Sequence, residues 1–442
     1  MNDDELTRRV AETLRAEAAK VKAPPDSWAH FTSGNVTVVA PTSIRRRRLV
    51  VASGLIGVVA VVALTAVLVS SSHHASTQIS STGGSTIPAP RPSAPPTTAP
   101  PFPVPVGPAG GPLPPGFTPA SVTFVSPSTG WALGSAPCST PPCTSVARTS
   151  DGGRTWVGIP APRTVLQDLP GAANAGVSTI RFANRLDGWA FGAELWATHD
   201  GGGTWHRVTI PGVAPNGMIE DLEAANGAVH VGVIDNQSQV RVATSPVGVD
   251  RWTTALAATQ VGAGPVPTGQ MVLQGGVGWF LQVDRTVVGG LRLVGGQWVA
   301  WTPPCATAGG PAVLAASSAT ELVAACDVGL WSGGPPAERL YVSHDAGASF
   351  ADLGVIPAVG VQAVAATAGR ILVAGTTTGQ QVLLLSTDGG RTWVPVLSRS
   401  GTAWVDVGFT TATQGVAIAT HELVMTSDGG QTWKPVSFAS AR

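Results

Sequence analysis

The hydrophobic residues of this chain form one uninterrupted run near the start, followed by a long series of short apolar stretches. The run covers residues 49–69 and contains no charged residue. As a helix it would rise about 30 Å at ~1.5 Å per residue, close to the thickness of a bilayer's hydrocarbon core. Arg45, Arg46, Arg47 and Arg48 directly precede it. By the positive-inside rule, the run is predicted to be a single transmembrane helix with a cytoplasmic N-terminus.

Two other interpretations of this run remain, a buried core helix and a cleaved signal peptide. Four adjacent arginines directly before a buried core helix would be unusual. The leader before the run is longer than a signal-peptide n-region, and no clear A-x-A cleavage site follows it. An uncleaved anchor therefore fits better, with residues 70–442 outside the cytoplasm.

The segments on either side of the run have different patterns. Residues 1–48 contain apolar positions at a spacing of three to four, which predicts a short amphipathic helix ending at Pro24. This cytoplasmic segment is either a tethered helix or, in residues 1–44, a docking site for a cytoplasmic partner. Residues 70–117 are rich in Ser, Thr and then Pro, a composition that cannot bury a core. They are predicted to be a disordered linker.

The short apolar stretches of residues 118–438 repeat around one motif, [ST]-x-D-x-G-x-[TS]-[WF]. It occurs at residues 149–156, 198–205, 343–350, 386–393 and 426–433. Successive aspartates are 49, 145, 43 and 40 residues apart. The long interval corresponds to about three repeats, which predicts two degenerate copies, at residues 244–252 and 293–298. The region therefore contains seven repeats.

A second element precedes the motif in several repeats. An apolar strand, a turn and a Gly-Trp or similar strand occur at residues 124–134, 182–192 and 409–419, with a partial copy at 275–280. Together with the strands on either side of the motif, each repeat predicts four short strands. Seven four-stranded units predict an all-β, seven-bladed β-propeller, with six or eight blades as alternatives.

The motif has the residues of a tight turn. Its aspartate can accept hydrogen bonds from backbone N–H groups, the glycine two residues later can adopt positive φ, and its aromatic residue can cover the blade. A structural role is therefore predicted for Asp151, Gly153, Trp156, Asp200, Gly202, Trp205, Asp345, Gly347, Phe350, Asp388, Gly390, Trp393, Asp428, Gly430 and Trp433. A calcium loop is the alternative, but one carboxylate per motif is fewer oxygens than calcium requires.

These motifs resemble the Asp-box (BNR) repeats of the sialidase-like β-propeller superfamily, and most closely its photosystem II assembly/stability factor-like domains. The resemblance implies the fold but not one function, because such domains include sialidases, other glycosidases, sorting receptors and non-catalytic assembly factors. A sialidase activity would imply three arginines, an acid/base aspartate and a tyrosine paired with a glutamate. The chain's single tyrosine makes Tyr341 and Glu338 the candidates, but the Arg-Ile-Pro motif of sialidases is missing.

Composition restricts the choice of ligand. The 442 residues include 26 basic and 26 acidic side chains, and only 12% of residues are charged. A neutral, charge-poor chain is a poor candidate for nucleic-acid binding, which requires many clustered lysines and arginines. The sequence contains no phosphate-binding loop, and the pair His421-Glu422 lacks the second histidine of a zinc-protease motif. No metal site and no cofactor are predicted.

The four cysteines all follow the predicted anchor. An even number in an extracytoplasmic region favours two disulfides. The nearest pairs are Cys138 with Cys143 and Cys305 with Cys326, one of three possible pairings. A four-cysteine zinc site is the alternative, although C-x-x-C spacing is missing.

The sequence thus predicts a single-pass cell-membrane protein with an extracytoplasmic propeller. The predicted function is a non-catalytic binding or assembly module for a protein, a peptide or a glycan. A sialidase-like glycoside hydrolase and a transmembrane signalling or regulatory protein remain as alternatives.

Overall fold

The computed structural model describes residues 107–167, 175–213, 217–234, 239–260, 268–284, 286–307, 310–328, 337–401 and 403–438. The predicted cytoplasmic segment at 1–48, the transmembrane run at 49–69 and the linker up to residue 106 lie outside these residues. Those expectations therefore stay predictions. Within the described part of the chain, no helix is both long enough and apolar enough to cross a bilayer.

The described residues form seven antiparallel sheets, each made of four consecutive strands. The first four blades are β1 (Thr118–Phe124), β2 (Gly130–Ser135), β3 (Thr144–Thr149) and β4 (Val157–Ile159); β5 (Val177–Phe182), β6 (Gly188–Gly192), β7 (Leu195–Thr198) and β8 (His206–Val208); β9 (Met218–Ala225), β10 (Ala228–Ile234), β11 (Gln239–Pro246) and β12 (Thr253–Gln260); and β13 (Thr268–Gln274), β14 (Val277–Asp284), β15 (Thr286–Val294) and β16 (Gln297–Trp301). The last three are β17 (Ala312–Ala316), β18 (Leu322–Asp327), β19 (Glu338–Ser343) and β20 (Ala351–Ile356); β21 (Val359–Thr367), β22 (Arg370–Thr377), β23 (Gln380–Ser386) and β24 (Val394–Arg399); and β25 (Trp404–Phe409), β26 (Gly415–Ala419), β27 (Glu422–Thr426) and β28 (Lys434–Pro435). One 3₁₀ turn, η1 (Pro304–Thr307), follows β16.

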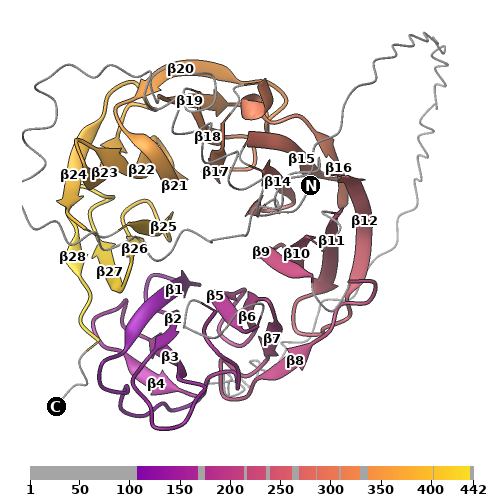
Figure 1. Ribbon diagram of the computed structural model, residues 1–442, viewed down its shortest axis with the longest axis vertical. Helices are drawn as coiled ribbons and strands as arrows, with labels where there is room; N and C mark the ends of the chain where they lie inside the picture. Colours follow the sequence, from indigo (N-terminus) through magenta and orange to yellow (C-terminus); the bar gives the residue numbers. More distant parts are fainter. Residues whose placement is uncertain are drawn as a thin grey trace, which may run out of the picture. The chain divides into compact units, whose positions relative to one another are not determined.

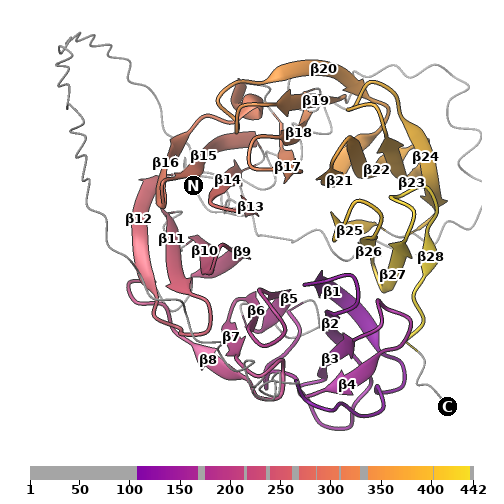
Figure 2. The same ribbon diagram turned by 180° about the vertical axis from the view of Figure 1, so that it is seen from behind.

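The seven sheets stand around a common centre, with the first strand of each innermost and the fourth outermost (Figure 1, and from behind in Figure 2). The predicted seven-bladed β-propeller is confirmed. Both degenerate repeats lie where they were predicted, residues 244–252 at the β11–β12 turn and residues 293–298 at the β15–β16 turn. The hydrophobic core is formed where the faces of adjacent blades pack together. For example, Leu340 of β19 packs in one cluster with Val373 of β22.

Among the described residues no strand is exchanged between blades 7 and 1, and these two blades meet through side chains. The amide Nε2 of Gln414 donates a hydrogen bond of 2.8 Å to the carbonyl oxygen of Pro127. The ring of Phe438, after the last strand, lies 4.9 Å from that of Phe117 and 5.2 Å from that of Trp156. These contacts join the two ends of the domain and close the ring.

The predicted linker at residues 70–117 extends too far in one respect. Leu113 and Phe117 are buried in the core cluster of blade 1. Gly111 also pairs with Gly158 of β4, with N–H···O distances of 2.8 and 2.9 Å. The composition of this stretch suggested a linker, but its few apolar side chains can be buried against a blade that is already folded.

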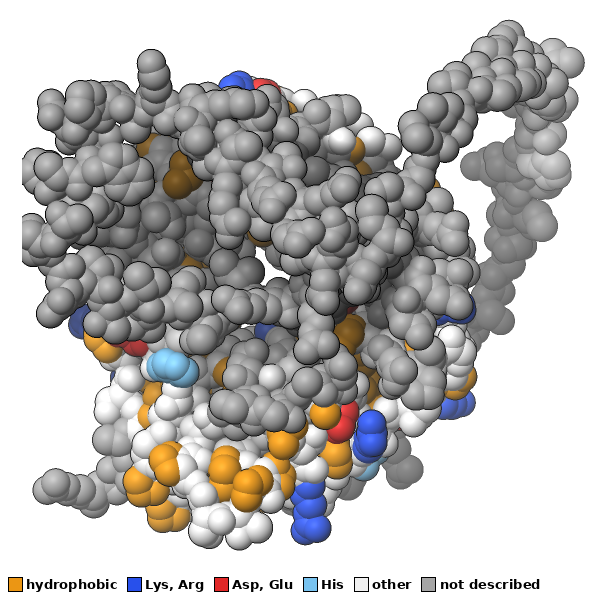
Figure 3. Space-filling model, viewed as in Figure 1, with side chains coloured by type: hydrophobic (Ala, Val, Ile, Leu, Met, Phe, Trp, Pro, Cys, Tyr) orange, Lys and Arg blue, Asp and Glu red, His pale blue; other side chains and the backbone are white. Residues whose placement is uncertain are grey.

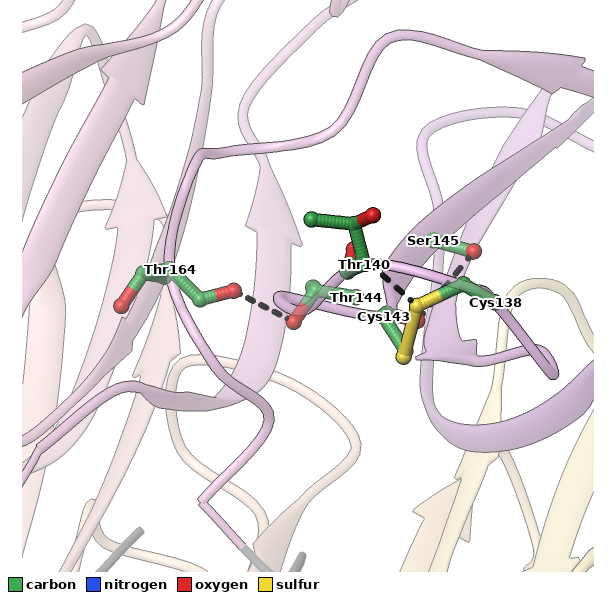
Figure 4. The surroundings of a disulfide bond; sticks show 6 residues. All are labelled: Cys138, Thr140, Cys143, Thr144, Ser145 and Thr164. Atoms are coloured by element: carbon green, nitrogen blue, oxygen red, sulfur yellow. Dashed lines mark hydrogen bonds between the residues drawn. A yellow bond between two sulfur atoms is a disulfide. The ribbon is translucent and has the colours of Figure 1, made fainter.

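Both predicted disulfides are present. Cys138 and Cys143 join the two ends of the loop between β2 and β3 (Figure 4). Next to them, the hydroxyl of Thr144 donates to the carbonyl oxygen of Thr164 at 2.6 Å. The second bond links Cys305 in η1 to Cys326 in β18, so it connects the end of blade 4 to blade 5.

The five turns that carry the motif, here called the aspartate turns, share one set of hydrogen bonds. In the first turn, Asp151 Oδ1 accepts from the hydroxyl of Thr149 and the backbone N–H of Thr155, both at 2.9 Å. Asp151 Oδ2 accepts from the hydroxyl of Thr155 at 2.6 Å, and the Thr149 hydroxyl accepts from the N–H of Gly153 at 2.9 Å. The other four turns repeat these bonds.

The glycine two residues after the aspartate of each turn has φ between +81° and +96°, the left-handed region that favours glycine. These glycines also approach the preceding blade closely. A Cβ atom at Gly153 would lie 2.6 Å from the sulfur of Met425, and one at Gly202 would lie 2.6 Å from Cδ1 of Ile159. The turn therefore needs glycine both for its backbone conformation and for blade packing.

The tryptophan of the Gly-Trp strand couples one blade to the aspartate turn of the next. Nε1 of Trp131 donates to the carbonyl oxygen of Gly201 at 3.2 Å, and Nε1 of Trp279 donates to that of Ala346 at 2.9 Å. Both acceptors directly follow the aspartate of a turn. Trp189 occupies the same place in blade 2, but the turn of blade 3 lacks the motif. Among the described residues, the buried Nε1 of Trp189 has no hydrogen-bond partner.

This difference predicts unequal costs for the same substitution at two buried tryptophans. Trp131→Phe removes an indole donor and leaves the Gly201 carbonyl unpaired, whereas Trp189→Phe removes a donor that bonds nothing described here. Trp131→Phe should lower the free energy of unfolding by about 1 kcal/mol more than Trp189→Phe. Urea unfolding followed by circular dichroism, with disulfides intact, measures both. Equal losses for the two variants would contradict the coupling.

Candidate functional site

The structure does not bring Tyr341 and Glu338 together. Both belong to β19, but residues three apart in a strand point to opposite faces. The ring of Tyr341 packs toward the cluster shared with blade 4, while Leu340, on the face of Glu338, packs toward blade 6. The tyrosine–glutamate pair implied by a sialidase is therefore not formed.

The carboxylate of Glu338 makes a different contact. Its Oε1 accepts a 2.9 Å hydrogen bond from the backbone N–H of Val361, on the inner strand of the next blade. Burial, and to a smaller extent the charge of Asp327, raises the pKa of Glu338 to about 7. Glu338 thus satisfies an edge-strand amide between two blades.

The five motif aspartates are spread around the ring at the turns between the third and fourth strands. Their oxygens are occupied by the hydrogen bonds of their own turns. In Asp388, for example, the hydroxyl of Thr392 and then the N–H of the same residue lower the pKa below its usual range. The aspartates do not converge on one place, so they do not form a shared site.

Charged side chains do converge at the inner strands. Among the described inner strands, β1, β13, β17 and β21 contain no charged residue. The charged residues of β5, β9 and β25 are Arg181, Glu220, Asp221, Glu223 and Asp406. One arginine against four carboxylates gives a formal charge of −3. We name Arg181, Asp221, Glu223 and Asp406 the axial cluster.

Arg181 is the centre of the axial cluster. Its Nε donates to Glu223 Oε1 at 2.9 Å, and its Nη2 lies 3.6 Å from Asp406 Oδ2. These contacts join inner strands of blades 2, 3 and 7, and blades 7, 1, 2 and 3 follow one another around the ring (Figures 1 and 2). Half of the Asp406 side chain is exposed (52%), against 20% of Arg181, so the carboxylates are more accessible than the guanidinium.

The electrostatics of the cluster reflect excess negative charge. Burial raises the pKa of Glu223, and the positive charge of Arg181 opposes this rise. Burial and then the charge of Glu223 raise the pKa of Asp221 to about 7. Both oxygens of Asp221 accept backbone N–H groups, from Leu222 and Met271, each at 2.8 Å. Nearby carboxylates thus disfavour one another's ionisation, and a cation would relieve this repulsion.

The rest of the visible described surface is different in character. On the face shown in Figure 3, over blades 1 and 2, apolar and uncharged side chains prevail and charged ones are scattered. On the described inner strands, by contrast, carboxylates outnumber the single arginine in the axial cluster. This excess of negative charge favours a ligand with cationic groups. Three arginines that would hold a sialoside carboxylate are not present on the described inner strands.

Sequence reasoning did not identify the axial cluster. A usable signal was present, because Arg181 and the acidic residues of β9 are the charged residues of first strands that are otherwise uncharged. Their convergence depends on the closed ring, since Arg181 and Asp406 belong to early and late repeats.

Comparison with known proteins supports the fold and does not reach a family. No protein-family model matches the chain, and no curated protein matches it. A solved structure described as YCF48 bound to D1 peptide is 17% identical with a TM-score of 0.50, covering 72% of this chain and 95% of that one. YCF48 from Cyanidioschyzon merolae is 16% identical with a TM-score of 0.48, covering 72% and 98%. A streptogramin B lyase is 11% identical with a TM-score of 0.49, covering 72% and 93%. The first of these likenesses supports the β-propeller fold of the domain.

The axial cluster predicts a pH-dependent effect of removing its cation. In Arg181→Met, Glu223 loses its partner, so its pKa in the folded state rises further above the unfolded value. The loss of stability should therefore be largest at high pH, where Glu223 is ionised, at about 2 kcal/mol, and should shrink as the pH falls and Glu223 takes up a proton. Urea unfolding at several pH values measures this.

The control for this prediction is Arg339→Met. Arg339 pairs with Asp352 on the exposed outer part of blade 5, with an Nη2–Oδ2 distance of 2.8 Å. An exposed pair contributes less than about 1 kcal/mol. A loss in Arg181→Met that is equally small, or that does not change with pH, would contradict the role given to Arg181.

Proposed function

We propose that the chain is a membrane-anchored binding module whose propeller, outside the cytoplasm, recognises a protein or peptide segment that carries lysine or arginine. The ligand contacts the axial cluster, and no chemical step is involved. We also assign the repeats to the Asp-box (BNR) class and its photosystem II assembly/stability factor-like branch. The support for that assignment is the hydrogen-bond set common to all five aspartate turns.

The observation that carries the binding proposal is the charge of the inner strands. Four carboxylates and one arginine lie there, and half of the Asp406 side chain is exposed to solvent. A partly enclosed site strengthens electrostatic interactions relative to water. A lysine or arginine side chain of a ligand would bring positive charge to carboxylates that now repel one another.

The comparison of folds adds support for a peptide as the ligand. The solved YCF48 structure with a TM-score of 0.50 has D1 peptide bound to it. A propeller of similar architecture can therefore hold a peptide. The identity of 17% carries no ligand across, so the cationic character of the ligand rests on the axial cluster of this chain alone.

The sialidase-like alternative gains no support from the site. Its ligand is an anion, and the described inner strands supply carboxylates and a single arginine. Tyr341 and Glu338 lie on opposite faces of β19. Signalling through residues 1–44 remains a separate prediction, since these residues lie outside the described part of the chain.

The anchor and the location are proposals with two supports. The apolar run at residues 49–69 follows four arginines, as in a helix with a cytoplasmic N-terminus. Two disulfides in the propeller are typical of an oxidising compartment. Both favour a propeller on the extracytoplasmic side.

Peptide binding tests the function. The full chain in nanodiscs of uncharged lipid should bind fluorescent peptides rich in lysine or arginine more tightly than neutral or acidic peptides of the same length. Glu223→Gln and Asp406→Asn should each weaken binding by about tenfold, because each removes one attractive charge at close range. Fluorescence anisotropy at low and high salt measures the affinities.

The matched control is Asp352→Asn, which removes an exposed carboxylate of β20, far from the inner strands, and should leave binding unchanged. A preference for acidic peptides, or unchanged affinity in both axial variants, would rule out the axial cluster as the site. Turnover of a fluorogenic sialoside that Tyr341→Phe abolishes would instead establish the glycosidase.

Topology is tested separately. Alkaline phosphatase fused after residue 442 should be active in cells, and green fluorescent protein fused at the same place should be dark, because each reports one side of the membrane. The same reporters fused before residue 1 should give the opposite result. A fluorescent C-terminal fusion would place the propeller in the cytoplasm and contradict the location.

A further inference from the structure

Two histidines and two aspartates gather at the junction of blades 2 and 3, away from the axial cluster. His199 belongs to the aspartate turn of blade 2, and His206 begins β8. Asp250 lies in the degenerate turn between β11 and β12, and Asp187 lies in the turn between β5 and β6. No metal site was predicted from the sequence, and none of these four residues was a predicted site residue.

The two imidazoles point at one carboxylate oxygen. Nε2 of His199 lies 2.9 Å from Asp250 Oδ2, and Nε2 of His206 lies 2.6 Å from the same atom. The three ligand atoms all lie within 4.8 Å of one another. The two rings are tilted by 45° with centroids 5.5 Å apart, so they approach the oxygen from different sides.

The other nitrogen of His199 is already occupied. Its Nδ1 lies 2.8 Å from Asp187 Oδ1, so it donates its proton to that carboxylate. In a neutral His199 this leaves Nε2 with a lone pair that faces an acceptor oxygen of Asp250. Such an arrangement is repulsive unless His199 carries a second proton or a cation lies between the two atoms.

We propose that His199 Nε2, His206 Nε2 and Asp250 bind a divalent transition-metal ion, with zinc as the best match. Two imidazoles and one carboxylate are ligands that zinc uses with a fourth position left to water, whereas calcium and magnesium prefer oxygen alone. Asp187 acts as the carboxylate that fixes the tautomer and the orientation of a metal-binding histidine.

The local geometry suits this ion after a small movement. Donor atoms on a tetrahedral zinc are about 3.3 Å apart, given zinc–nitrogen distances of ~2.0 to 2.1 Å. The two nitrogen–oxygen distances, now 2.6 and 2.9 Å, would each lengthen by about half an ångström. His206 is half-exposed, with 53% of its side chain accessible, so it can move and leaves the fourth position open to solvent.

The backbone and the charges also indicate a built site. Asp250 adopts φ of +44°, which is uncommon for a residue other than glycine. Its second oxygen, Oδ1, is buried and lacks a hydrogen-bond partner among the described residues. Asp250 therefore has unused acceptor capacity, which a metal ion can use.

The site lies where the regular contacts between blades are missing. The turn of blade 3 does not have the aspartate motif, and it offers no described acceptor to the indole of Trp189. A metal held by His199 and His206 of blade 2 and by Asp250 of blade 3 would join these blades directly. Its role would be to fasten this junction in place of the missing hydrogen bonds.

Zinc titration of the full chain tests the site. The untagged protein is freed of metal with a chelator, and His73 and His74, the adjacent histidines of the linker, are replaced by Gln in every sample. Isothermal titration should show one equivalent of Zn²⁺ bound, and Zn²⁺ should raise Tm by about 2 °C or more. Co²⁺ should give the visible absorption of a tetrahedral site.

His206→Gln and Asp250→Asn should each weaken Zn²⁺ binding at least about tenfold and abolish the Tm shift. Asp187→Asn should weaken binding about tenfold without removing a ligand. The matched control is His344→Gln, because His344 precedes the aspartate of the blade 5 turn as His199 does in blade 2, and its Nδ1 contacts Glu321 alone among the described residues.

Circular dichroism and the unfolding midpoint without metal show whether each variant folds. His206 is half-exposed, so His206→Gln is expected to remain folded even if Asp250→Asn does not. Absence of zinc binding, or binding that survives His206→Gln, would overturn the proposal. In the first case the cluster is an ion pair with a protonated His199. Loss of binding in His344→Gln would overturn it as well.

Discussion

The hydrogen bonds between the motif aspartate, two hydroxyl groups and the turn amides are the interaction on which this ring depends. A four-stranded sheet has two edges and two apolar faces, so one blade alone cannot bury its core. The turn between the third and fourth strands fixes how each blade meets its neighbour. The glycine two residues after the aspartate lets side chains of the previous blade approach the backbone, as Met425 does at Gly153 and Leu340 does at Gly390. In two of the five turns, the carbonyl of the residue after the aspartate also accepts an indole N–H from the previous blade, as in Trp131 to Gly201.

The inner edges of the blades are satisfied in a second way. The first strand of each sheet has unpaired backbone groups on its open side, and side chains of the preceding blade bond to them. Ser121 accepts from the N–H of Ile180, Gln270 accepts from that of Leu314, and Glu338 accepts from that of Val361. Asp221 does the same for Met271. A carboxylate in this position is buried and its pKa rises. The acidic character of the centre is therefore partly a consequence of how the blades are joined.

The sequence predicted what depends on neighbours in the chain. The motif, the spacing and the Gly-Trp strands determine the turns, the strands and the number of blades, and nearby cysteines determine the disulfides. What it did not predict depends on ring closure. Arg181 meets Asp406 only because the last blade lies beside the first. The predicted pair of Tyr341 and Glu338 is not formed for a local reason, since residues three apart on a strand face opposite sides of the sheet. The predicted linker is too long at its C-terminal end, because composition alone does not show that Leu113 and Phe117 pack against a blade.

Loss of the motif in a repeat has two consequences that act together. A blade without the aspartate turn holds its neighbour less firmly, as the unbonded indole of Trp189 indicates. The same loss frees the turn from one fixed set of hydrogen bonds, so that its side chains can take other partners. In blade 3 the freed turn presents Asp250 to His199 and His206, residues that belong to an intact turn and the strand after it. The intact turn fixes one side of the junction through its own hydrogen bonds, and the degenerate turn contributes Asp250. In a ring of repeated units, a binding site that the other repeats lack is therefore expected where a degenerate repeat lies beside a regular one.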